Sequence, residues 1–88
     1  MADDLMEFYG TECPHCIEME PLIKKLEKET KLKIKRYEVW HNEKNKALFE
    51  KTDNGKCGGV PFFYNKKSGK FICGSGSYKE LKEWAQGK

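Results

Sequence analysis

The chain has 88 residues, which is the size of a single domain, because domains typically contain about 100–200 residues. Hydrophobic residues make up 38% of the chain, enough for a core, which argues against intrinsic disorder. Apolar runs are only two or three residues long, so we expect no membrane-spanning segment. Lys and Arg number 17 against 14 Asp and Glu, and the two signs are interleaved, so nucleic acid is not an expected partner.

The first two elements are a strand followed by a helix. Leu5–Tyr9 is a short apolar run that predicts a strand, and Pro14 suits the first position of a helix. Apolar residues at three- and four-residue steps predict an amphipathic helix that reaches about Thr30. These apolar residues are Ile17, Met19, Leu22, Ile23 and Leu26.

The rest of the chain adds three strands and two helices. A second strand is predicted within residues 32–40, and Asn42 can cap a helix that ends near Asn54. Ser77 and Glu80 form a capping-box pattern before the last helix. Strands are predicted at 62–64 and 71–73, as an antiparallel hairpin. The predicted order is β-α-β-α-β-β-α in one α/β domain over residues 1–88, with Tyr37, Phe49, Phe62, Phe63 and Trp84 as core aromatics.

The four cysteines divide into one close pair and two single residues. Cys13 and Cys16 form a Cys-x-x-Cys motif, whereas Cys57 and Cys73 stand alone. A disulfide across two residues closes almost no loop and adds little stability, so the close pair indicates chemistry. We interpret the two single cysteines as small buried hydrophobic residues, with a regulatory thiol as the alternative for Cys57.

The helix start gives the two close cysteines different roles. Cys13 precedes the helix, where unpaired backbone N–H groups favour thiolate over thiol, so it is the predicted exposed nucleophile. Cys16 lies one turn further on and can resolve a mixed disulfide formed at Cys13. His15 would stabilise a Cys13 thiolate, and Glu12 would oppose it. His41 is expected to face solvent or act as a cap.

The Cys13-Pro14-His15-Cys16 motif, preceded by Glu7-Phe8-Tyr9, resembles the active-site segment of the thioredoxin superfamily. Its Pro-His pair is the one typical of DsbA-type disulfide oxidoreductases. Pro21 and Val60-Pro61 match the superfamily's helix proline and cis-proline loop. The resemblance covers almost the whole chain and implies a thioredoxin fold, with a four-stranded mixed sheet and helices on both faces. The chain lacks room for the helical insertion of DsbA proteins, and Glu12 stands where ordinary thioredoxins have tryptophan.

The resemblance also implies roles for residues outside the motif. Glu7 maps onto a buried acid behind Cys16 that could take its proton, although a place on an edge strand with Glu7 facing outward is the alternative. Val60 and Pro61 would hold the backbone of an extended substrate. The implied activity is thiol–disulfide exchange with protein thiols through the Cys13–Cys16 couple, with no cofactor or metal. A reductase or glutathione would supply the electrons. We expect the protein to be a cytoplasmic monomer that does not bind a membrane.

Two other functions remain open from the residues. One is a glutaredoxin-like reductase that binds a glutathione carboxylate through Lys56, Lys66 or residues 74–77. The other is a metal or iron–sulfur module using Cys13 with Cys16 or Cys57, which would need further ligands. The basic residues Lys31, Lys33, Lys35 and Arg36 are interpreted as a solvated strand face.

Overall fold

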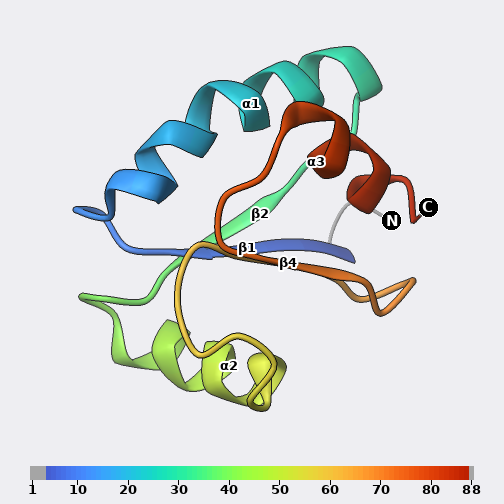
Figure 1. The fold of residues 1–88 in the computed structure, drawn as a ribbon. Helices are drawn as coiled ribbons and strands as arrows, with labels where there is room; N and C mark the ends of the chain where they lie inside the picture. The colour runs from blue at the N-terminus through green and yellow to red at the C-terminus, as the bar shows by residue number, and fades with distance from the viewer. Residues whose placement is uncertain (1–3, 88) are drawn as a thin grey trace.

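The computed structural model describes residues 4–87 and has the element order expected from the sequence (Figure 1). No helix within residues 4–87 is both long and apolar enough to cross a membrane. The elements are β1 (Leu5–Tyr9), α1 (Pro14–Thr30), β2 (Lys35–Glu38), α2 (Glu43–Asp53), β3 (Phe62–Asn65), β4 (Phe71–Cys73) and α3 (Tyr78–Ala85).

The four strands form one mixed sheet in the order β2-β1-β3-β4. β1 pairs parallel with β2 and antiparallel with β3, and β3 pairs antiparallel with β4. Helices α1 and α3 cover one face of the sheet, and α2 covers the other (Figure 1). This arrangement confirms the predicted thioredoxin fold, and it makes β1 a central strand with a neighbour on each side.

Two hydrophobic clusters fill the two sides of the sheet, and β1 contributes to both. Leu5 belongs to the cluster beneath α1 and α3, whereas Met6 and Phe8 belong to the cluster beneath α2. Successive side chains of a strand point to opposite faces, so Glu7 shares the α1 face with Leu5. The first cluster is Leu5, Met19, Ile23, Leu26, Ile34, Phe63, Leu81, Trp84 and Ala85; the second is Met6, Phe8, Val39, Phe49 and Phe62.

β2 is shorter than the predicted segment 32–40, because side chains at the end of α1 take backbone donors that a longer strand would use. The amide of Leu32 donates to Thr30 Oγ1 at 3.2 Å, and the amide of Ile34 donates to Glu27 Oε2 at 2.9 Å. The ordered strand therefore begins only at Lys35.

One member of the predicted apolar stripe of α1 does not join the core. Ile17 is 51% exposed, whereas Met19, Ile23 and Leu26 are buried. It lies in the first turn of the helix, directly after Cys16. The departure from the pattern places an exposed apolar side chain next to the cysteine pair.

Candidate active site

The two motif cysteines lie at the start of α1, and both are free thiols. Cys13 is the N-cap residue and Pro14 opens the helix. The amide of Cys16 donates to Cys13 Sγ at 3.4 Å, and the amide of Cys13 donates to the Gly10 carbonyl at 3.1 Å. The capping geometry therefore directs a backbone N–H group at the Cys13 sulfur, which stabilises negative charge there.

Cys13 is less accessible than the sequence predicted. Only 5% of Cys13 is exposed, and only 1% of Cys16. The loop before β3 lies against it: the Cys13 thiol donates a hydrogen bond to the Val60 carbonyl, with 3.8 Å between Sγ and the oxygen. Cys13 is still the more accessible of the two motif cysteines.

Cys16 lies in an environment that disfavours its thiolate. Burial raises the pKa of Cys16 to about 12, and the hydrogen bond with the Cys13 side chain adds to the rise. A thiol with this pKa carries almost no negative charge near neutral pH, so an attack by Cys16 requires a base that removes its proton.

A buried carboxylate, Glu7, lies on the same face of the sheet as α1. Glu7 is fully buried on the central strand β1, which excludes the alternative of an outward-facing residue on an edge strand. Burial raises the pKa of Glu7, and the positive charge of Arg36 opposes the rise. Among the described residues Glu7 Oε2 is buried without a hydrogen-bond partner, so one oxygen is free to exchange a proton.

Lys31, Lys33, Lys35 and Arg36 are all exposed, as expected for a solvated face, but Arg36 also forms an ion pair that the sequence did not predict. Its Nε donates to Glu7 Oε1 at 2.6 Å. The guanidinium also lies 4.3 Å from the centre of the Tyr9 ring and 3.6 Å from Glu20 Oε2. Glu7 and Arg36 are opposite each other in the parallel register of β1 and β2, a signal available only once the pairing is known.

The Val60–Pro61 peptide bond is cis, as expected, and Pro61 is buried. The loop faces a surface hollow of about 320 Å³ that includes Val60, the two preceding glycines and Trp40. Trp40 is 51% exposed and was not singled out in the sequence as a site residue. The hollow is lined by Val39, Trp40, Lys46, Phe49, Gly58, Gly59 and Val60.

Trp40 packs directly on the backbone of Gly10. A Cβ atom on Gly10 would lie 2.2 Å from Trp40 Cδ2, far inside contact distance. We expect Gly10→Ala to lower the free energy of unfolding by about 1–3 kcal/mol, because the ring must move from its packed position. Denaturant unfolding measures the loss. Gly59→Ala is the control, since its Cβ meets nothing within 4 Å; an equal loss in both variants would contradict this packing argument.

The His15 side chain makes its hydrogen bond to Glu18 and not to Cys13. It is exposed, and within residues 4–87 its side-chain partner is Glu18, with 3.3 Å between His15 Nδ1 and Glu18 Oε1. The i,i+3 spacing on the helix explains the pairing. Any effect of His15 on Cys13 must therefore act through space as a charge, without a hydrogen bond.

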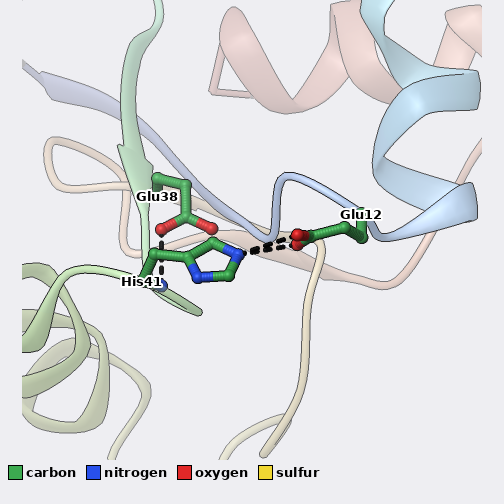
Figure 2. Close-up of side chains that lie close together, drawn as sticks. All are labelled: Glu12, Glu38 and His41. Carbon is green, nitrogen blue, oxygen red and sulfur yellow. Dashed lines mark hydrogen bonds and ion pairs between the residues drawn. The ribbon is translucent and has the colours of Figure 1, made fainter.

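A polar network links the loop before Cys13 to the end of β2 (Figure 2). His41 Nε2 lies 2.8 and 3.0 Å from the two carboxylate oxygens of Glu12. Glu38 accepts hydrogen bonds from the amides of Thr11 and His41. One possible metal-ligand atom from each of Glu12, Glu38 and His41 lies within 4.8 Å of the others. These groups already have hydrogen-bond partners, because Glu12 pairs with the His41 ring and Glu38 accepts from backbone amides.

The Glu12–His41 pair gives a prediction for pH titration. The hydrogen bond to Glu12 and its negative charge raise the pKa of His41 above 6.5. This contribution to folding is complete below the unfolded-state pKa and is lost as the pH rises through the higher folded-state pKa. We expect an NMR titration of the His41 ring to show a midpoint above 6.5, and Glu12→Gln to lower it. An unchanged midpoint in that variant would exclude the pair in solution.

The two single cysteines are not the small buried hydrophobic residues expected from the sequence. They form a disulfide with 5.4 Å between their Cα atoms; Cys73 is exposed and Cys57 is half-buried. The strands bring them together, because Cys73 ends β4 beside the start of β3. While this bond is present, the Cys57 sulfur is not a thiolate ligand for a metal shared with Cys13 and Cys16.

The residues suggested for glutathione binding do not form one site. At the start of α3, the backbone N–H of Ser77 already donates to the carboxylate of Glu80, at 3.0 Å from Oε1. This donor is therefore not available to a glutathione carboxylate. This hydrogen bond lowers the pKa of Glu80. Lys56 and Lys66 instead line a hollow of about 430 Å³, together with Met6, Leu48, Lys51, Thr52, Asn54 and Tyr64.

The sheet order, the helix layers and a Cys-x-x-Cys pair at the start of α1 define a protein of the thioredoxin-fold class. The Thioredoxin family model matches residues 2–86, and the chain belongs to this family. The sequence matches none of the curated proteins with which it was compared.

Solved structures with the same fold include three from different organisms. A single-substitution mutant of thioredoxin from Halobacterium salinarum is 24% identical, with a TM-score of 0.73 over 96% of this chain and 74% of that one. A thioredoxin-like protein from Clostridium perfringens is 25% identical, with a TM-score of 0.73 over 93% and 67% of the two chains. Oxidised mitochondrial thioredoxin 3 from Saccharomyces cerevisiae is 19% identical, with a TM-score of 0.68 over 96% and 78%.

Proposed function

We propose that this protein is a thiol–disulfide oxidoreductase that uses Cys13 and Cys16 as its redox couple. The observation that carries the proposal is the asymmetry of the site. Cys13 receives a backbone N–H at the helix start, whereas Cys16 is buried on the α1 side of a sheet that carries a buried carboxylate. One sulfur is thus suited to exchange with a substrate and the other to resolve the product.

In the reducing direction, the Cys13 thiolate attacks one sulfur of a substrate disulfide and forms a mixed disulfide. Cys16 then loses its proton and attacks Cys13, which releases the substrate thiol and leaves a Cys13–Cys16 disulfide. Glu7 takes that proton, because burial raises the pKa of its carboxyl group and its Oε2 has no hydrogen-bond partner among the described residues. Oxidation of a substrate dithiol is the same sequence in reverse. The couple itself needs no further cofactor or metal.

Docking of a protein substrate is supported by the surface around Cys13. Ile17 and Trp40 are both about half exposed, so each offers apolar surface to a partner. Trp40 shares its hollow with Val60, whose carbonyl faces the Cys13 sulfur. An extended peptide can pair with the Val60 backbone while its apolar side chains cover Ile17 and Trp40. Protein thiols and disulfides are therefore the substrates we favour.

The reduction potential of the Cys13–Cys16 couple tests the proposal. The protein is equilibrated in glutathione redox buffers, alkylated, and analysed by mass spectrometry so that each cysteine pair is scored separately. We expect a two-electron transition at Cys13–Cys16, at a value more oxidising than the roughly −270 mV of thioredoxin, because the Pro14-His15 pair resembles the DsbA-type motif. A value at or below that level would remove the DsbA-type comparison.

Metal analysis of anaerobically purified protein, with thiol counting, tests the metal-binding alternative. If the protein holds stoichiometric metal and Cys13 and Cys16 do not react with the thiol reagent, the redox function is contradicted. A mixed disulfide at Cys13 that forms and resolves faster with glutathione than with a peptide would favour a glutaredoxin-like activity.

A further inference from the structure

A second cysteine pair fastens the segment that leads into the docking loop. Cys57 lies between α2 and β3, three residues before Val60, and its disulfide partner Cys73 ends β4. The ladder places Cys73 opposite Phe62, the residue after Pro61. The disulfide therefore connects the segment before Val60 to β4, and β4 pairs with β3, which begins two residues after Val60.

Besides the disulfide, Asp53 and one hydrophobic cluster hold the segment that leads to Val60. The buried carboxylate of Asp53 accepts hydrogen bonds from Cys57 N at 2.6 Å and from Gly58 N at 2.9 Å. Cys57 and Val60 also pack against the cluster beneath α2. Gly58 and Gly59, between them, have no side chains to pack, and a Cβ on either would meet nothing within 4 Å. The path of the backbone through the two glycines thus depends mainly on Asp53 and on Cys57 with its disulfide.

The bond is open to chemical change. Cys73 is exposed at the end of the edge strand β4, and Cys57 is half-buried. A thiol can therefore reach the Cys73 sulfur without opening the core. The two buried motif cysteines are in a different environment, so the two pairs can be in different redox states.

We propose that the Cys57–Cys73 disulfide positions the Val60 backbone for peptide substrates, so that its reduction by a dithiol weakens substrate docking while the sulfur chemistry at Cys13 continues. One thiolate of the dithiol attacks Cys73, and its second thiol closes the dithiol's own disulfide. Two electrons and two protons pass to the protein, and Cys57 and Cys73 become thiols. The inference rests on the proposed function, because it concerns the docking step of that same site.

Direct binding tests the inference without any exchange at the motif. A variant with Cys13→Ser and Cys16→Ser retains only the Cys57–Cys73 pair, so a reductant changes that pair alone. The probe is a short extended peptide with serine in place of its reactive cysteine, titrated by NMR before reduction, in excess dithiothreitol, and after reoxidation. We expect reduction to weaken binding about five- to thirty-fold, because the segment before Val60 must then be ordered on binding. Reoxidation restores the affinity.

The matched control carries Cys57→Ser and Cys73→Ser in addition, and its affinity should be low and insensitive to dithiothreitol. Equal affinity in the reduced and oxidised states would overturn the inference. Loss of the native circular dichroism spectrum on reduction would overturn it too, because the bond would then stabilise the whole fold and not a local backbone.

Single-turnover kinetics separate failure of this inference from failure of the proposed function. The Cys57→Ser/Cys73→Ser variant and the unchanged protein, each with an oxidised Cys13–Cys16 motif, are mixed with increasing concentrations of a reduced dithiol peptide or of dithiothreitol. We expect the variant to raise the peptide concentration that gives half of the limiting rate, to leave that limiting rate unchanged, and to leave the rate with dithiothreitol unchanged. No exchange with dithiothreitol in either protein would refute the function. Exchange with an unchanged half-saturating peptide concentration would refute only the positioning role.

Discussion

Replacing Cys13 with serine is expected to abolish thiol–disulfide exchange, whereas replacing Cys16 with serine should stop the reaction at the mixed disulfide. Cys13 is the sulfur that the helix-start amide stabilises, so without it no first attack occurs. Cys16→Ser retains that attack but has no thiol to release the substrate. Mass spectrometry of each variant, after incubation with an oxidised peptide, detects the trapped adduct.

Alkylation of the reduced protein gives an independent check on this assignment. Iodoacetamide at mildly acidic pH should label Cys13 first, since the pKa of Cys16 is raised to about 12 by burial. The Cys57→Ser/Cys73→Ser variant serves as the control and should show the same order of labelling. Faster labelling of Cys16 than of Cys13, or an adduct at Cys16, would reverse the assigned roles.

Replacing Glu7 with glutamine is expected to slow the resolving step about 100-fold near neutral pH, within the range for loss of a general base. The attack by Cys13 should change little, because that step does not require removal of the proton of Cys16. Without the carboxylate, the resolving rate should keep rising with pH toward the high pKa of Cys16. Stopped-flow measurement of mixed-disulfide decay against pH distinguishes this profile from the unchanged protein.

The same substitution should change how the stability of the fold depends on pH. Burial raises the pKa of Glu7, so its protonated form is favoured in the folded state, and stability is lost as the pH rises through that pKa. A glutamine cannot ionise, so we expect Glu7→Gln to gain stability relative to the unchanged protein as the pH rises.

The stability gain of Glu7→Gln should shrink as the pH falls into the acidic range. Glu20→Gln is the control, since Glu20 also lies near Arg36 but is 40% exposed.

One kinetic outcome would contradict the role of Glu7 as a base. If Glu7→Gln slows the attack by Cys13 and the resolution by Cys16 equally, Glu7 acts through the fold.

The sequence was sufficient to predict the order of elements, because each one has its own local signal. Pro14 opens α1, Asn42 caps α2 through the amide of Asn45, and Ser77 with Glu80 caps α3. These contacts span three or four residues and are visible in the sequence alone. The prediction was weaker for β2, whose start depends on Glu27. That residue acts from the end of α1, and its contact with Ile34 is not implied by any alternation.

Without the family resemblance, which supplied Glu7 and Val60-Pro61, the site was predicted only where its residues are close in sequence. Cys13 and Cys16 follow from one motif, but the Glu7–Arg36 pair depends on the parallel register of two strands. The Cys57–Cys73 bond depends on the hairpin that returns β4 to the side of β3. Contacts between residues far apart in the chain are products of topology, and composition and spacing do not reveal them.

The position of Glu7 on β1 links the proposed proton transfer to the cooperativity of folding. β1 has a strand on each side and a hydrophobic cluster on each face, so its amides can exchange with solvent only when the whole domain opens. A partly unfolded form that has lost β1 has also lost the environment that raises the pKa of Glu7. Thiol–disulfide exchange activity and the folded population should therefore decline together during denaturation, with no active, partly unfolded intermediate.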